Sequence, residues 1–305
     1  KPPRAGEPPA LRPMPARQPF TVLCQSLARP RQFGRADLHV HTTCSDGIYT
    51  PAQIVELARR SGLAAVAITD HDTLAGVAPA RQATGDAVEI VAGVEITAEY
   101  RGAELHLLGY FLRLDDEPLR SALGRLCVRR QERFREMVQR LADLGVALDA
   151  QQAESCVNAV APGRRHLAEL LVKARQAGNV REAFQRWLSD RGRVNVAKAR
   201  LPVAEAITLV RQASGVAAWA HPSYDACKDT LPKLRDLGLQ AIEVDYPNCR
   251  PGQERNLRGW AAELGLAVTG GSDCHGPTTP PRGLGSCGVT RAELETLREL
   301  SINES

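Results

Sequence analysis

Short apolar runs alternate with amphipathic segments from residue 36 onward. Such runs are typical of strands buried on both faces, and amphipathic segments with apolar residues at helical spacing are typical of covering helices. The pattern predicts strands at 36–41, 63–69, 87–100, 103–111, 216–222, 239–247 and 266–275, and helices at 50–62, 203–215, 230–238 and 252–265. Repeated strand–helix units imply an α/β fold with a mostly parallel sheet, and their number favours closure into a barrel.

The helix predicted at 50–62 carries the clearest local signals. Thr50 is a suitable N-cap, Pro51 stands in the first turn, and Gly62 follows the last apolar position. Proline near the start and glycine after the end are the positions at which these residues favour a helix.

A long helical stretch interrupts the alternation of strands and helices between residues 115 and 202. Residues 117–145 keep their apolar positions near helical spacing, and further helices fit 164–178 and 180–192. We therefore predict a first barrel part at 36–114, a helical insertion (cap) at 115–202 and a second barrel part at 203–305.

Residues 1–35 are rich in Pro and Arg, and they lack helical or strand periodicity until residue 20. This composition predicts a flexible leader. The segment has no long apolar core of the kind that a secretory signal needs. An Arg-rich targeting sequence is an alternative that the composition allows.

Charge is distributed unevenly along a chain whose net charge is +4. Residues 113–205 carry a net charge of +6, whereas 36–112 and 206–305 together carry −8. An acidic body suits cations and a basic insertion suits phosphates, although an ordinary solvated surface would give the same pattern.

Composition narrows the class of protein further. With 43% hydrophobic residues among 305, the chain can bury a sizeable core. It has no apolar run of about 18 residues, so we expect no membrane span. The eight cysteines include no Cys-x-x-Cys pair and are scattered, which favours reduced thiols in a cytoplasmic protein. No sign of an obligate protein partner is evident.

Histidine positions give the first indication of chemistry. Six of the seven histidines stand at the predicted C-terminal end of a strand or within the strand pair around Glu95. These six are His39, His41, His71, His106, His221 and His275. Active sites of α/β barrels form at the C-terminal ends of the strands, so we expect these side chains to meet there.

The sequence Asp37-x-His39-x-His41 puts three polar side chains on one side of a strand, because strand side chains alternate. Two imidazoles and a carboxylate that converge in this way favour a divalent metal ion as their partner. Asp46 follows in a turn that can fold it back over the strand end, unless it is a simple turn residue.

A second candidate cluster, Asp70-His71-Asp72, directly follows a buried strand. His71 is its natural metal ligand. Either aspartate could orient the His71 ring, as ring partners usually do at metal sites, or could cap the following segment.

Glu95 and His106 form a third candidate cluster on neighbouring strands. A buried carboxylate between cations can bridge two of them, which is the role we expect of Glu95. Glu99 and Glu104 also lie nearby, but their neighbours resemble a hairpin tip, so we expect both to be solvated.

The remaining candidates lie near the second half of the predicted barrel. His221 follows an apolar strand, and Asp273-x-His275 places an aspartate and an imidazole on one face, with Cys274 pointing away. Nitrogen and oxygen ligands from five strand ends exceed one tetrahedral zinc site, so we expect two or three divalent metal ions per chain. Mixed imidazole and carboxylate ligands suit Mn, Fe or Zn.

Several of these motifs together resemble those of the PHP (polymerase and histidinol phosphatase) superfamily. They read DLHVHTTCSDG, ITDHDT, GVEI, HLLGY, AHP and GGSDCHG, in order from about residue 36 to 290. The helical insertion and its GRRHLA segment resemble the branch that contains nucleoside 3′,5′-bisphosphate phosphatases and 5′→3′ exoribonucleases.

This resemblance implies a distorted (β/α)7 barrel with a trinuclear metal site, manganese being favoured. His39, His41, Glu95 and Asp273 would hold one metal, and Asp46, His71 and His275 a second. The third would be held by Glu95, His106 and His221, with Glu95 bridging. Arg164 and His166 would reach the substrate phosphate, although a surface charge and a helix N-terminal residue remain alternative roles for them. Asn195 stands where the family often has an aromatic residue, which affects how a base is contacted.

The resulting hypothesis is metal-assisted hydrolysis of a phosphoester by a hydroxide held between two metals, with Asp46, His71, Glu95, Asp273 and His275 as catalytic residues. The favoured substrate is a nucleoside 3′,5′-bisphosphate or a short 5′-phosphorylated RNA. One alternative is a phosphatase of another small metabolite such as histidinol phosphate. Another is a metal-stabilised binding domain whose catalytic site has decayed.

Overall fold

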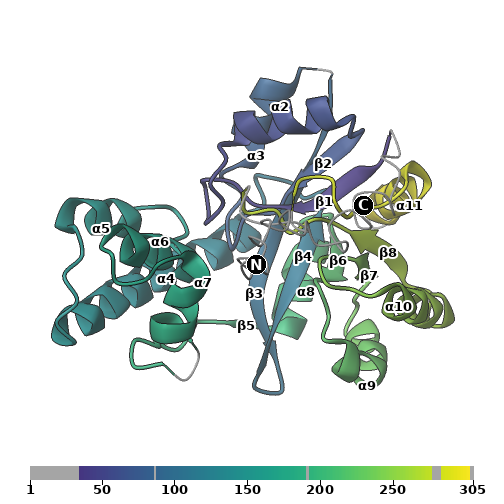
Figure 1. Cartoon of the computed structure of the whole chain (residues 1–305). Coiled ribbons are helices and arrows are strands. Elements are labelled where there is room, and N and C mark those ends of the chain that lie inside the picture. The colour runs from purple at the N-terminus through teal and green to yellow at the C-terminus, as the bar shows by residue number, and fades with distance from the viewer. Residues whose placement is uncertain (1–33, 86, 190–191, 277–282, 303–305) are drawn as a thin grey trace, which may run out of the picture. The chain divides into compact units, whose positions relative to one another are not determined.

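The computed structural model describes residues 34–85, 87–189, 192–276 and 283–302, and the chain from Gly34 onward forms one compact unit. The leader predicted at 1–35 lies outside the described residues except for its last two positions. Strands and helices alternate in the first and last parts of this unit, and a hairpin followed by a run of helices lies between those parts (Figure 1). The strands are β1 (Ala36–Val40), β2 (Ala65–Ile68), β3 (Glu89–Tyr100), β4 (Ala103–Tyr110), β5 (Leu201–Pro202), β6 (Val216–Trp219), β7 (Ala241–Asp245) and β8 (Ala267–Gly270).

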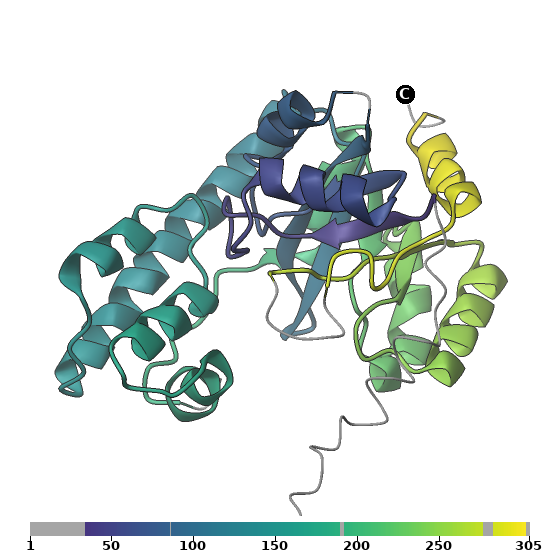
Figure 2. The same cartoon turned by 45° about the horizontal axis from the view of Figure 1, so that its top comes forward.

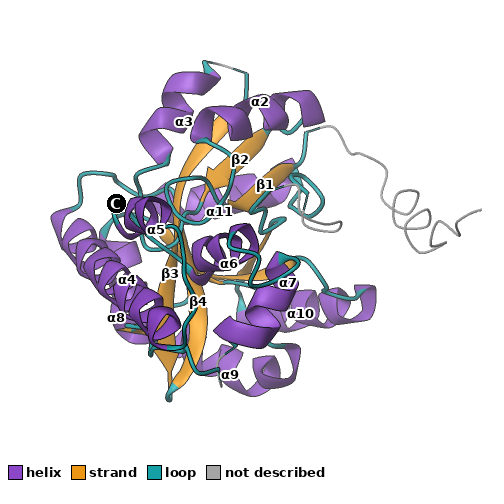
Figure 3. Cartoon of the chain, turned by 60° about the vertical axis from the view of Figure 1, so that its left-hand side comes forward, coloured by secondary structure: helices purple, strands orange, loops and turns teal. Residues whose placement is uncertain are grey.

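Helices separate and surround these strands (Figure 3). They are α2 (Pro51–Ser61), α3 (Val77–Thr84), α4 (Glu117–Asp143), α5 (Ala150–Val157), α6 (Arg164–Lys173), α7 (Val180–Ala183), α8 (Val203–Gln212), α9 (Tyr224–Asp236), α10 (Pro251–Leu264) and α11 (Arg291–Ile302), with a π-helical turn, η1, at Phe184–Leu188. None of the helices in the described ranges combines the length and the apolar character that crossing a membrane requires.

The sheet is mostly parallel and nearly closed. Seven strands follow the order β1-β2-β3-β4-β6-β7-β8, and β5 pairs with β3. Only β4 runs against both of its neighbours on this path, because it returns from β3 in a hairpin. Isolated bridges join Val40 to Cys274 and Ala36 to Val289, which brings the chain after β8 against β1. The predicted distorted (β/α)7 barrel is thereby confirmed.

Helix α2 forms as its local sequence predicts. The Thr50 side chain accepts from the Gln53 amide, the Gln53 side chain accepts from the Thr50 amide, and Gly62 adopts a left-handed φ of 68°. This reciprocal cap satisfies amides that the first helical turn leaves unpaired, and glycine takes the left-handed conformation at little steric cost.

Other elements differ from the prediction. The helices α3, α5 and α11 were not predicted, and neither was the short strand β5. The helix predicted at 180–192 is instead the single turn α7 followed by η1. The strand predicted at 266–275 ends at Gly270, so that its polar residues lie in a loop beyond the strand.

The long helix α4 belongs to two apolar clusters at once. Its first half packs Leu119, Leu123 and Leu126 with strand and α8 residues. Its second half packs Phe134 and Met137 with residues of α5, α6 and η1. The helix therefore runs from the sheet into the group of insertion helices (Figure 2). The division of the chain at residues 115 and 202 stays a prediction.

Phe134 is fully buried in the cluster that α4 forms with the insertion helices, and we predict a large loss of stability from Phe134→Ala. Removing a buried aromatic ring leaves a cavity and typically costs about 3–5 kcal/mol in the free energy of unfolding, measurable by urea denaturation. Val128 lies on the same helix with 53% of its surface exposed, so Val128→Ala should change that free energy by less than about 0.5 kcal/mol. Equal effects of both substitutions would show that the second half of α4 is not packed as described.

Candidate metal centre

Glu95 lies at the centre of the candidate site, on β3, and is 1% exposed. Its carboxylate oxygens approach five imidazoles. The partners are His106 Nδ1 at 2.7 Å, His71 Nδ1 at 2.8 Å, His221 Nε2 at 3.0 Å, His41 Nε2 at 3.3 Å and His39 Nε2 at 3.4 Å. These imidazoles come from β1, β4 and the loops after β1, β2 and β6, so the fold brings together segments more than a hundred residues apart.

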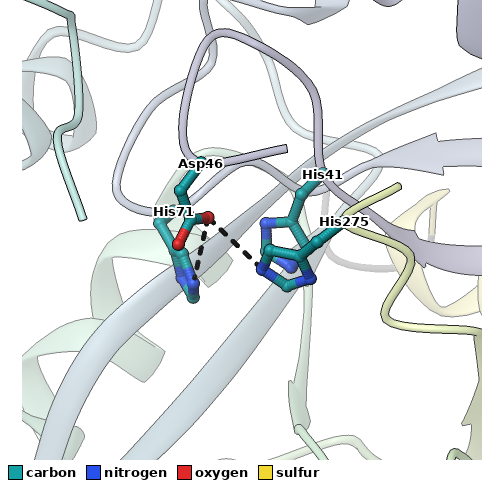
Figure 4. Close-up of side chains that lie close together, drawn as sticks. All are labelled: His41, Asp46, His71 and His275. Atoms are coloured by element: carbon teal, nitrogen blue, oxygen red, sulfur yellow. Dashed lines mark ion pairs between the residues drawn. The ribbon is translucent and has the colours of Figure 1, made fainter. Parts of the chain in front are cut away.

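A second group of side chains lies beside Glu95. His41, Asp46, His71 and His275 point toward one another from three loops (Figure 4). Asp46 Oδ1 is 3.3 Å from His275 Nε2 and 3.8 Å from His71 Nε2, and the His41 and His275 rings stack with centroids 4.0 Å apart. The turn after β1 thus folds Asp46 back over the strand end, as predicted.

Asp273 completes the cluster from the loop after β8. Its Oδ1 lies 3.3 Å from His41 Nε2, 3.7 Å from His39 Nε2 and 3.3 Å from His275 Nδ1. Asp273 has a φ of 49° and His221 has a φ of 26°, which non-glycine residues rarely adopt. Such strain costs about 1–3 kcal/mol per residue and is typical of positions that function requires. Cys274, between two cluster residues, packs instead into an apolar core.

The donor atoms fit divalent metal ions. Four overlapping groups of three or four side chains each bring one nitrogen or oxygen atom per residue within 4.8 Å of one another. Several of these buried atoms lie close to one another but form no hydrogen bond of acceptable geometry among the described residues. They are His39 Nε2, His41 Nε2, Asp46 Oδ1, His71 Nδ1 and Glu95 Oε2. A buried polar atom without a partner is costly, and cations bound in these groups would satisfy the atoms that lack one.

The electrostatics of the cluster also favour cations. Burial alone would lower the pKa of His106 and of His275, but nearby carboxylates raise both to about 9. Burial and the neighbouring His275 and His71 rings lower the pKa of His41 to about 3. Burial alone would raise the pKa of Glu95, but the surrounding imidazoles hold it well below its usual range. The carboxylates are therefore ionised and need positive charge beside them, whether from protons or from metals.

Glu243, on β7, supports this cluster and was missed by the sequence analysis. It is fully buried, its Oε1 lies 3.1 Å from His39 Nδ1, and its Oε2 accepts from the His221 amide at 2.5 Å. This contact turns His39 Nε2 toward Glu95 and holds the strained loop that carries His221. A charged residue inside the apolar run of a buried strand was the signal that could have identified it.

Asp70 has neither of the two roles predicted for it. Its carboxylate does not contact the His71 ring, and the N-cap of α3 is Gly76. Its carboxylate accepts from Thr42 N and Thr42 Oγ1, both at 2.7 Å, and from Ser45 Oγ at 2.6 Å. Asp70 therefore fixes the turn after β1 that delivers Asp46.

Asp72 likewise makes none of the predicted contacts. It accepts from Thr97 N at 2.7 Å, from Thr97 Oγ1 at 2.9 Å and from Arg130 Nε at 2.5 Å. A carboxylate with these partners ties the loop after β2 to β3 and to α4.

Asp37 was expected to converge with His39 and His41, but its carboxylate contacts other residues. It accepts from Ser272 N at 2.9 Å, Ser272 Oγ at 2.6 Å and Gly285 N at 2.8 Å, and it belongs to none of the four groups of donor atoms. Its burial raises its pKa to about 6, so the cost of its charge is only partly offset by these hydrogen bonds.

Glu104 is not the solvated hairpin residue that was predicted. Its side chain is 26% exposed, contacts His106 Nε2 at 3.2 Å and forms ion pairs with Lys198 and Arg200. The sequence could not indicate these partners, because the segment before β5 meets the hairpin only in the folded chain.

The two residues predicted to contact substrate begin helix α6. Gly163, just before them, leaves no room for a side chain, since an added Cβ would lie 2.8 Å from Asp46 Oδ2. His166 Nδ1 accepts from the Gly163 amide at 3.1 Å. Arg164 Nη1 donates to Leu188 O at 3.0 Å. The start of α6 therefore packs directly against the metal-binding candidates.

Comparison with known proteins agrees with this geometry. The model of the PHP domain family matches residues 37–189. The 5′-3′ exoribonuclease Rnm of Salmonella typhimurium is 31% identical over 79% of this chain and 85% of its own length. The 3′,5′-nucleoside bisphosphate phosphatase of Chromobacterium violaceum is 28% identical over 82% of this chain and 90% of its own length.

A solved structure from Bifidobacterium adolescentis, assigned as a metal-dependent phosphoesterase, has the same fold. It has a TM-score of 0.81 and 30% identity, and it covers 88% of this chain and 97% of its own. The matched family model, the identity shared with the Salmonella relative and this similarity of fold together establish that the chain belongs to the PHP domain family.

Proposed function

We propose that this chain is a metal-dependent phosphoesterase that releases phosphate from nucleoside 3′,5′-bisphosphates or short 5′-phosphorylated oligonucleotides. One observation carries the proposal: five imidazoles approach the buried carboxylate of Glu95. Three of their nitrogens, on His39, His41 and His71, have no hydrogen-bond partner among the described residues. Membership of the PHP domain family and the names of the similar proteins support the same reaction class.

We propose that the residues of this cluster hold two or three divalent cations. They are His39, His41, Asp46, His71, Glu95, His106, His221, Asp273 and His275. When bound, the cations would activate a water molecule and neutralise phosphate oxygens. Mixed imidazole and carboxylate donors suit manganese, iron or zinc, and manganese is the ion that we propose. Asp46, His71, Glu95, Asp273 and His275 form the part of the cluster where we place the reacting phosphate.

Arg164 and His166 are proposed to bind the substrate phosphate. They stand in the first turn of α6, which packs against Asp46 through Gly163. Backbone amides and the positive end of the helix dipole favour an anion at this position. The net positive charge of residues 113–205 supports an anionic substrate such as a nucleotide or a short RNA.

A side-by-side assay tests this function. Release of phosphate should be measured from adenosine 3′,5′-bisphosphate and from histidinol phosphate, and release of phosphate or of mononucleotides from a short 5′-phosphorylated RNA, each with manganese-loaded protein. We expect release from one or both of the first two substrates at a kcat/KM at least about tenfold above that for histidinol phosphate. Preference for histidinol phosphate would replace the substrate assignment, and release from none of the three would refute the proposed function.

Glu243→Gln should lower kcat by about 10- to 100-fold, because it weakens the contact that turns His39 toward Glu95. Its metal affinity, followed by titration with manganese, should fall in the same range, and restoring the charge with Glu243→Asp should recover part of both. If kcat falls without any change in metal affinity, Glu243 does not act through the metal-binding histidines.

A further inference from the structure

His221 differs from the other proposed metal ligands in how it is held. Its side chain is 33% exposed, whereas the side chains of the other ligands are 17% exposed or less. Its Nε2 lies 3.0 Å from Glu95 Oε1, and it belongs to a single group of donor atoms, with His39 and Glu95. Because packing encloses its side chain least, the position of His221 depends more on the backbone that carries it.

The backbone at His221 is strained. Its φ of 26° lies in a region that residues with a side chain rarely adopt. Pro222 follows directly, and a proline further restricts the backbone of the residue before it. A strained conformation costs free energy and persists only where surrounding contacts hold it. The loop after β6 therefore needs restraints from other parts of the fold.

Two side chains, one on β7 and one directly after it, restrain this loop. Glu243 Oε2 accepts from the His221 amide at 2.5 Å. Tyr246 Oη donates to Pro222 O at 2.8 Å. Strands β6 and β7 are parallel neighbours, so residues beyond their C-terminal ends can meet. The two contacts hold the chain on both sides of the strained residue.

Tyr246 has the properties of a fixed hydrogen-bond donor. Its ring is partly buried against the apolar cluster that includes Val244 and Leu257. Burial raises the pKa of Tyr246 above its ordinary value, so that its hydroxyl keeps its proton at neutral pH and can donate. One side chain thus combines a packed ring with a hydrogen bond to the loop that carries His221.

We propose that Tyr246 is a positioning residue for His221 and so sets the affinity of the metal position to which His221 contributes. This inference rests on the proposed function, because it takes His221 as a metal ligand. Without the Tyr246 hydroxyl, the strained loop would relax and carry the imidazole away from Glu95. The other groups of donor atoms do not include His221, so the metal positions that they form would keep their ligands.

Titration of the metal-free protein with manganese tests this role, with the bound ions counted by elemental analysis after equilibrium dialysis. Tyr246→Phe keeps the packed ring and removes only the hydroxyl. We expect it to weaken one manganese position by about three- to tenfold, the effect of losing one neutral hydrogen bond, and to leave the others within about twofold. Unchanged manganese binding in Tyr246→Phe would overturn the proposal.

Tyr224→Phe is the matched control, because it removes another hydrogen-bonded tyrosine hydroxyl nearby. Tyr224 Oη accepts from Asn256 Nδ2 at 2.5 Å and its ring stacks on Trp260, so that these partners lie on α10. We expect this variant to keep every manganese affinity within about twofold of the wild-type protein. Equal weakening by both substitutions would show a general loss of packing, and Tyr246 would then have no specific role at the metal centre.

A double-mutant cycle shows whether Tyr246 acts through His221. His221→Ala should weaken the same manganese position by about tenfold or more. Adding Tyr246→Phe to that variant should cost less than about twofold further, since the side chain that Tyr246 positions is already gone. If the double variant instead loses the full product of the two separate effects, Tyr246 acts by another route and the proposal fails.

The readout is metal binding rather than turnover, which separates this inference from the substrate assignment. A wild-type protein that binds manganese but hydrolyses none of the three substrates would refute the proposed function, while the two tyrosine variants and the cycle would still decide the role of Tyr246. A wild-type protein that binds no manganese would overturn the metal assignment and this role together.

Discussion

Glu95→Gln should lower kcat by at least about a thousandfold and remove most of the bound divalent metal from the purified chain. The substitution keeps the shape of the side chain but removes the negative charge that five imidazoles surround. Without that charge, adjacent cations would repel one another, and the positive charge that stabilises a reacting phosphate would be lost. Phosphate release and elemental analysis of the same preparation measure both effects.

Glu99 provides the matched control, because it lies four positions farther along β3 and outside the four groups of donor atoms. Glu99→Gln makes the same chemical change and should leave both kcat and metal content within about twofold of the wild-type protein. Circular dichroism should show both variants folded. Full activity and full metal content in folded Glu95→Gln would mean that Glu95 is not at the centre of a metal site.

Removal of metal by EDTA should lower the melting temperature by about 5–10 °C for each site emptied. A ligand that binds only the folded chain adds about 2.7 kcal/mol to the free energy of unfolding at one hundred times its Kd. For a domain of roughly this size, that energy corresponds to a shift of about 2–4 °C per kcal/mol. Thermal unfolding followed with and without EDTA, and again after manganese is added back, gives the shift directly.

The Glu95→Gln variant separates this effect from general effects of EDTA. Since it should already lack most of its metal, EDTA should change its melting temperature by less than about 2 °C. A wild-type protein whose melting temperature does not respond to EDTA or manganese would show that cations contribute nothing to its folded state.

The sequence predicted those parts of the fold that local chemistry determines. Helix α2 was predicted because Thr50, Pro51 and Gly62 mark both of its ends. Helix α3 was missed because its N-cap, Gly76, makes no side-chain hydrogen bond, so that no residue signals its start. The antiparallel direction of β4 depends on the hairpin turn rather than on the apolar pattern, which is the same for either direction.

The candidate site was predictable to the extent that strand ends determine it. Nine side chains expected to meet do lie together, because the C-terminal ends of neighbouring strands share one edge of the barrel. The partners of Asp70 and Asp72 could not be predicted, since they come from Thr42, Thr97 and Arg130 on other elements. The same holds for Glu104, whose lysine and arginine partners approach only in the folded chain.

Anomalous diffraction at the manganese absorption edge, from crystals grown with manganese, tests the central claim most directly. We expect two or three peaks among the Glu95, His41, Asp46 and Asp273 side chains, at about 2.0–2.3 Å from their donor atoms. Crystals with no anomalous peak among these residues, or with peaks only at the molecular surface, would contradict the account.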